Sequence, residues 1–171
     1  MLPLQSLWAS LSVKDSIGTK LLLKRVEKEI GISIKNNPTR VQEFRASVGL
    51  NKGNWCACFV RWGLDRSMYA KFPIRSGVAN AYKTRYTIKA KDVLTGKAKV
   101  GQGWLVIWKN KGSWTGHIGY VIDWDKMYGS TIEGNTSDND TRQGGNVEKK
   151  RRKIDIFNSF SIVAFTPVYK W

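Results

Sequence analysis

Apolar residues recur at helical spacing in the first half of the chain. In residues 15–31, and again in residues 36–49, apolar side chains return every three or four positions and form one stripe on a helix. A third helix is predicted for residues 54–63, with Asn54 as its N-cap. A short fourth helix is predicted for residues 76–85.

The pattern changes after about residue 86. Short segments rich in β-branched and aromatic residues are separated by Gly, Asn, Asp and Ser, which is typical of strands and turns. Helices followed by strands predict an α+β fold with an antiparallel sheet. The expected strands lie in residues 85–90, 103–110, 116–124, 130–135, 144–153 and 160–168.

The length of 171 residues suits one domain with a substantial core. We expect residues 1–13 to be an N-terminal extension and residues 14–171 to form a single domain. No apolar run approaches the roughly 20 residues of a membrane span. The first residues have neither a basic segment nor a cleavage site, so no signal peptide is predicted.

The chain is strongly basic, with 29 Lys and Arg against 13 Asp and Glu, a net charge of +16. Such a surface favours polyanions: nucleic acid, anionic lipid or the acidic polymers of a bacterial envelope. It also fits a surface that only provides solubility. The stretch "EKKRRK", residues 148–153, is interpreted as the solvated face of a strand, with adhesion to envelope polymers as the alternative.

Both cysteines, Cys56 and Cys58, lie in "NWCACFVRWG". At this spacing on a helix their side chains diverge, which argues against a disulfide, and one His in the chain leaves too few soft ligands for zinc. Cys56 falls in the first turn of the predicted helix, where the macrodipole favours a thiolate. Cys56 is therefore a candidate nucleophile or a buried thiol, and Cys58 is interpreted as a core residue.

His117 is the only histidine and begins an apolar strand, "GHIGYVIDW". It would need a third group to hold its ring. Asp123 is roughly 20 Å further along the same strand, which is too far. A turn centred near Asp125 would place Glu133 of the next strand opposite His117. Asn135 is an alternative for orienting the ring, a donor near the reacting carbonyl, or a turn residue.

Two tryptophans flank these residues. Trp55 precedes Cys56 and Trp114 precedes His117, and both are candidates for the wall of a substrate groove, with packing as the default. The segment at residues 138–145 only faintly resembles a calcium loop, because Arg142 replaces an oxygen ligand, and we interpret it as a polar loop. No metal or cofactor is expected.

Three motifs in order, "NWCACFVRW", "GHIGYV" and "TIEGNTS", resemble the CHAP domain, the cysteine- and histidine-dependent amidohydrolase/peptidase family. The resemblance covers roughly residues 20–168. It implies a papain-like fold in which the helix carrying the nucleophile packs on a C-terminal antiparallel sheet. It also implies Cys56 as nucleophile, His117 as base, and Glu133 and Asn135 as their supports.

The resemblance implies a peptidoglycan hydrolase, either an N-acetylmuramoyl-L-alanine amidase or an endopeptidase. The Pro-Gly-Asp turn that often precedes the histidine strand in this family is replaced here by "KVGQGWLVIW". We expect a monomer that acts on the cell wall after release from the host cytoplasm or delivery by a virion, with a phage lysin favoured. The alternatives are a bacterial amidase toxin and a non-enzymatic basic module that binds nucleic acid.

Overall fold

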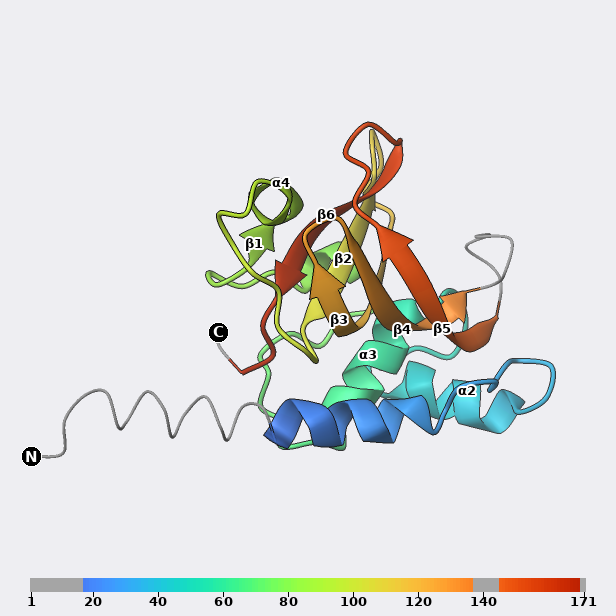
Figure 1. The fold of residues 1–171 in the computed structure, drawn as a ribbon. Coiled ribbons are helices and arrows are strands. Elements are labelled where there is room, and N and C mark those ends of the chain that lie inside the picture. Colours follow the sequence, from blue (N-terminus) through green and yellow to red (C-terminus); the bar gives the residue numbers. More distant parts are fainter. Residues whose placement is uncertain (1–16, 137–144, 170–171) are drawn as a thin grey trace, which may run out of the picture.

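The computed structural model describes residues 17–136 and 145–169. Its centre is a six-stranded sheet with the strand order β1-β6-β2-β3-β4-β5, in which every neighbouring pair is antiparallel. The N-terminal helices lie together on one side of the sheet (Figure 1). The predicted α+β class is therefore confirmed, with the helix that carries Cys56 packed against the sheet.

The strands follow the segments expected from the sequence, with differences at their ends. The first is only two residues long and runs directly into a short helix, α4 (Ala90–Leu94), which the sequence pattern did not predict. The strands are β1 (Ile88–Lys89), β2 (Leu105–Asn110), β3 (Gly116–Asp125), β4 (Tyr128–Thr136), β5 (Asn146–Lys153) and β6 (Phe160–Thr166).

The first two helices agree with the apolar periodicity. Residues 17–27 are helical, and α2 (Pro38–Ala46) begins where the Asn37 side chain accepts a hydrogen bond from the backbone N–H of Arg40 at 3.0 Å. Such a cap satisfies one of the free N–H groups at the helix start. The fourth predicted helix is wrong, because only a single 3₁₀ turn forms there, η1 (Ala79–Ala81).

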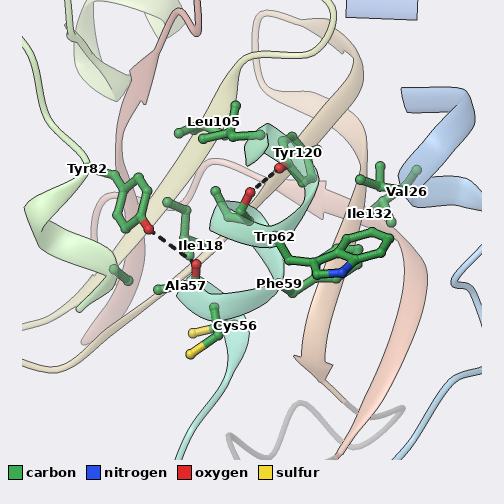
Figure 2. Close-up of a cluster of buried hydrophobic side chains, with 14 of the residues drawn as sticks. Val26, Cys56, Ala57, Phe59, Trp62, Tyr82, Leu105, Ile118, Tyr120 and Ile132 are labelled. Atoms are coloured by element: carbon green, nitrogen blue, oxygen red, sulfur yellow. Dashed lines mark hydrogen bonds between the residues drawn. The ribbon is translucent and has the colours of Figure 1, made fainter. Parts of the chain in front are cut away.

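The third helix, α3 (Cys56–Asp65), is the central helix of the core. Trp55, and not Asn54, occupies its N-cap position, so the predicted cap is wrong by one residue. Nine of its ten residues are buried because the helix is enclosed by the other helices on one side and by β3 and β4 on the other. Figure 2 shows Cys56 at the start of this helix and Phe59 and Trp62 further along it.

Two tyrosine hydroxyls donate hydrogen bonds to backbone carbonyls of α3. The hydroxyl of Tyr120 on β3 donates to the backbone carbonyl of Val60, and that of Tyr82 donates to the carbonyl of Ala57 at 3.3 Å (Figure 2). Buried hydroxyls need such partners. Because Tyr120 is fixed to the middle of the helix, the start of β3 is held near the N-terminal end of α3.

The opposite face of the sheet carries a second apolar cluster, which includes Val106, Trp108, Val121 and Phe165. Successive residues of a strand point to opposite faces. Ile118 and Tyr120 belong to the cluster around α3, so His117, Gly119 and Val121 project from the other side of β3.

Among the described residues, none of the helices is both long and apolar enough to cross a membrane. The predicted extension at residues 1–13 lies outside the described residues, as do positions 138–144 of the predicted polar loop.

Candidate active site

Cys56 is the first residue of α3, where the free backbone N–H groups of a helix gather. It is 6% exposed, and its thiol lies near enough to the side chain of His117 to raise the pKa of that ring. Both cysteines are free. The structure thus brings together the thiol and the imidazole that the sequence singled out.

Cys58 has a different environment although it is only two residues away. Its side chain is fully buried in the core, and its sulfur lies 3.8 Å from the backbone oxygen of Asn54. Burial raises the pKa of the Cys58 thiol to about 12. A thiol with this pKa stays protonated at neutral pH and is a poor nucleophile.

His117 is bound on both sides. Its Nε2 lies 2.8 Å from Oε2 of Glu133, which leaves Nδ1 as the ring nitrogen for Cys56. Burial by itself lowers the His117 pKa, but the interactions with Cys56 and Glu133 outweigh it and raise this pKa to about 9. The ring therefore keeps its proton at neutral pH, as an imidazolium beside the ionised carboxylate of Glu133.

The strand register differs from the one expected. Glu133 lies opposite Gly119 and not opposite His117. The turn between β3 and β4 follows Asp125, one to two residues later than predicted, and a bulge after Val121 shifts the pairing back by one position. Glu133 therefore reaches His117 diagonally, over a residue that has no side chain.

The absent side chain of Gly119 makes this diagonal contact possible. A Cβ at position 119 would lie 2.6 Å from Cγ of Glu133 and 2.9 Å from the backbone oxygen of Ile132. Both distances are shorter than real Cβ contacts, and the second neighbour is backbone and cannot move aside.

Gly119→Ala is therefore expected to push Glu133 away from His117 and to lower kcat by about 10–100-fold. The measurement is kcat in a double-mutant cycle with Glu133→Gln. If Gly119 acts through Glu133, the alanine adds little to the loss already caused by Glu133→Gln. Two fully additive losses would contradict this explanation.

Arg152 of β5 is a site residue that the sequence analysis missed. Its Nε donates to Oε1 of Glu133 at 2.7 Å, and its Nη2 donates to Oε2 at 2.6 Å. Thr131 adds a third donor, its hydroxyl lying 2.5 Å from Oε1. Burial raises the pKa of Glu133, but the bonds from Arg152 and His117 prevail and lower it to about 2.

Trp108 of β2 packs against His117 and Arg152. Its ring centroid lies 5.2 Å from that of His117, and the guanidinium of Arg152 lies 5.5 Å from the centroid of the same indole. The tryptophan is 5% exposed and shields the ion pair from water. Charge interactions strengthen where water is excluded.

Asn135 is buried at the end of β4 and contacts the residue pair that precedes α3. Its backbone is in the left-handed region, with a φ of 57°, and its Nδ2 donates to Oδ1 of Asn54 at 3.3 Å. Asn54 is two residues before Cys56, so this bond connects the end of β4 to the start of α3. With Nε2 of His117 bound to Glu133, the imidazole is oriented by the carboxylate.

The two tryptophans proposed for a groove have opposite environments. Trp55 is fully buried, and its ring stacks on Phe44 with centroids 5.5 Å apart. It offers no face to a substrate, so we correct this part of the prediction: Trp55 is a core residue. Trp114 is 75% exposed, three residues before His117, and stays a candidate for substrate contact.

Within residues 17–136 and 145–169, no group of three or more His, Cys, Asp or Glu side chains gathers as metal ligands would. The groups that the structure brings together at the site are a thiol, an imidazole and an ionised carboxylate. This set can form and hydrolyse a thioester without further groups.

The comparisons with known proteins agree with the geometry. The family model described as the CHAP domain matches residues 48–135, just over half of the 171 residues. The matched segment contains Cys56, His117, Glu133 and Asn135, whereas Arg152 lies beyond it. Neither curated proteins nor solved structures gave a match.

Proposed function

Because the chain belongs to the CHAP domain family of cysteine- and histidine-dependent hydrolases, we propose that it cleaves an amide bond in the peptides of bacterial peptidoglycan. The bond is either the N-acetylmuramoyl-L-alanine amide or one within the peptide or its cross-bridge. The observation that carries the proposal is the order of the three groups: Cys56 at a helix N-terminus, His117 beside it, and Glu133 hydrogen-bonded to the far side of the imidazole.

The first half of the reaction forms a thioester. The Cys56 thiolate attacks the amide carbonyl carbon, and a backbone N–H at the start of α3 stabilises the developing oxyanion. His117 then gives its proton to the amine nitrogen as the C–N bond breaks. The amine leaves, and the acyl group stays on the sulfur of Cys56.

The second half returns the enzyme to its starting state. Neutral His117 takes a proton from water, and the hydroxide equivalent attacks the thioester carbonyl. The C–S bond breaks, the carboxylic acid product leaves, and the thiolate–imidazolium pair is restored. Glu133 keeps the ring at one angle throughout and stabilises its charged form.

The pH profile of kcat/KM is expected to fall on its alkaline side near pH 9. Above this pH, His117 loses the proton that the leaving amine needs, because its pKa is about 9. Glu133, with a pKa of about 2, stays ionised down to strongly acidic pH and contributes no acid limb near neutrality. Initial rates between about pH 4 and pH 10 test this expectation. An alkaline limb near pH 6.5, the ordinary value of a free imidazole, would contradict it.

We favour a phage lysin that reaches the wall after release from the host cytoplasm or with a virion. A bacterial amidase toxin would use the same chemistry. The basic surface of the chain supports contact with the acidic polymers of the envelope in either case.

The experiment that tests the function is mass spectrometry of purified peptidoglycan after incubation with the protein. The control is protein treated with iodoacetamide, which should alkylate Cys56 and spare the fully buried Cys58. New muropeptides from the untreated protein alone are expected, and their masses name the bond. Absence of products across several wall chemotypes would overturn the proposal and favour the nucleic-acid-binding alternative.

A further inference from the structure

A cavity of about 530 Å³ lies on the helical side of the molecule, away from Cys56. Its walls come from the helix of residues 17–27 and the turn after it, from α2, and from the C-terminal end of α3. None of the proposed catalytic residues lines it, so the cavity is unexplained by the proposed reaction.

The charge of the cavity is one-sided. Among the described lining residues, the cationic ones are Lys24, Arg25, Lys28, Arg40 and Arg66, and the only acidic one is Glu29. Glu29 forms an ion pair with Arg40, with Oε2 3.2 Å from Nε. Glu43, outside the lining, binds the same guanidinium through Nη1 at 2.5 Å. Two carboxylates against five cations still leave an excess of positive charge in the recess, where the field of converging charges is focused.

Trp62 forms part of the cavity lining and holds two of these cations together. The guanidinium of Arg66 lies 4.7 Å from the centroid of its indole, and that of Arg40 lies 5.6 Å from the same centroid. Two like charges near one ring repel each other, and a bound anion beside them offsets the repulsion. The Nε1–H of Trp62 is buried and has no acceptor among the described residues.

We propose that this cavity binds phosphodiester groups of an anionic polymer attached to the bacterial wall. The proposal rests on peptidoglycan being the substrate. Guanidinium groups bind phosphate oxygens through paired, charge-assisted hydrogen bonds, and the lysines add charge at the rim. The structure thus assigns a wall-anchoring site to the helical side.

Two other phosphate-bearing partners fit less well. Single-stranded nucleic acid is held by stacking on open aromatic faces, but Trp62 is only 3% exposed and lies beneath two guanidiniums. A membrane presents its phosphates in a plane, whereas this site is recessed. A flexible polymer can place one or two phosphodiester groups inside the recess.

The position of the cavity allows anchoring and catalysis at the same time. Arg66 directly follows the last residue of α3, and Cys56 is the first. A helix of this length places the two sites about 15 Å apart. A polymer bound at one end would keep the chain beside the wall while the other end acts, which raises the local substrate concentration.

The test is cosedimentation with purified cell walls, using Cys56→Ala protein so that the walls stay intact. Walls are used untreated, and after hydrofluoric acid has removed their phosphodiester-linked polymers. Arg40→Gln with Arg66→Gln is expected to weaken binding to untreated walls at least tenfold. Protein that keeps Arg40 and Arg66 is expected to bind the acid-treated walls weakly. This binding should be as weak as that of the Arg40→Gln/Arg66→Gln variant to untreated walls.

The matched control is Arg85→Gln with Arg151→Gln. These exposed arginines also lie against aromatic rings, Tyr86 and Tyr128, but outside the cavity, and the charge change is the same. The control is expected to keep near-original binding. Equal weakening in both variants would mean that net charge alone acts and would overturn the proposal. Full binding to acid-treated walls, or tighter binding to phosphatidylglycerol vesicles than to walls, would also overturn it.

A second readout separates this proposal from the proposed function. With Cys56 intact, the Arg40/Arg66 variant should hydrolyse small soluble muropeptides at the original rate and lose efficiency only on intact walls. Loss on both substrates would show that the arginines stabilise the fold and would overturn the anchoring role. Specific wall binding without hydrolysis by any form of the protein would leave the anchoring site standing and remove the proposed function.

Discussion

Cys56→Ala is expected to lower peptidoglycan turnover by at least about 1,000-fold, whereas Cys58→Ala keeps turnover close to that of the unmodified protein. Cys56 starts α3 and lies beside His117, so its sulfur is the one placed to form a thioester. Cys58 is fully buried and its pKa is raised to about 12. The two substitutions remove the same atom from positions two residues apart, and each is a control for the other.

Alkylation kinetics provide an independent measurement of the same contrast. Iodoacetamide should modify Cys56 rapidly in the folded protein, and mass mapping should find Cys58 modified only after unfolding. The Cys58→Ala protein should lose about 1 kcal/mol or more of stability through the cavity that it creates, and this is read as a lower Tm. Equal alkylation rates for the two thiols in the folded protein would be inconsistent with Cys56 as nucleophile.

Arg152→Met is expected to reduce kcat by about 10–100-fold with little change in KM. Glu133 is fully buried, and its carboxylate depends on Arg152 for two of its hydrogen bonds. Without the guanidinium, burial raises the pKa of Glu133, and the carboxyl group takes up a proton. A protonated Glu133 no longer stabilises the His117 imidazolium, so an acid limb should appear in the pH profile within the assay range.

Arg151→Met is the matched control for this prediction. Arg151 is the preceding residue of β5, is exposed, and lies against the Tyr128 ring at 5.7 Å, away from Glu133. It should leave both kcat and the pH profile unchanged. Arg152→Lys should restore part of the activity, because a single ammonium keeps the charge but cannot bind both carboxylate oxygens in one plane. If Arg152→Met lowers Tm but its pH profile shows no new acid limb, Arg152 only stabilises the fold.

The sequence was sufficient for the first three helices and for most of the strands, because their apolar periodicity is strong. The predictions were wrong where the periodicity is weak. Residues 76–85 form only one 3₁₀ turn and not a helix, and the short helix α4 after the two-residue β1 was not predicted. The cysteine, histidine and glutamate of the site could be chosen from residue type, order and strand pairing. Their exact register could not, because it depends on a bulge that leaves no mark in the amino-acid pattern.

Arg152 could not be found from the sequence for a related reason. The stretch of residues 148–153 is charged at every position, so alternation along β5 cannot show which side of the strand is buried. Only the packing of the sheet places Arg152 beside Trp108 and Glu133. The prediction for Trp55 was wrong for the opposite reason. Its place beside Cys56 in the chain suggested that it lines a substrate groove, but its ring packs into the core.

The strand order has a consequence for how the protein is made. The last strand, β6, inserts between β1 and β2, and thus pairs with β2 along the edge opposite to β3. Until residues 160–166 have left the ribosome, β2 keeps one edge unpaired, and Trp108 lacks its neighbour Ile162. The long-range pairing makes the sheet close late, which slows folding relative to a simple meander. The nascent chain therefore completes the surroundings of its imidazole only after residues 160–166 have been made.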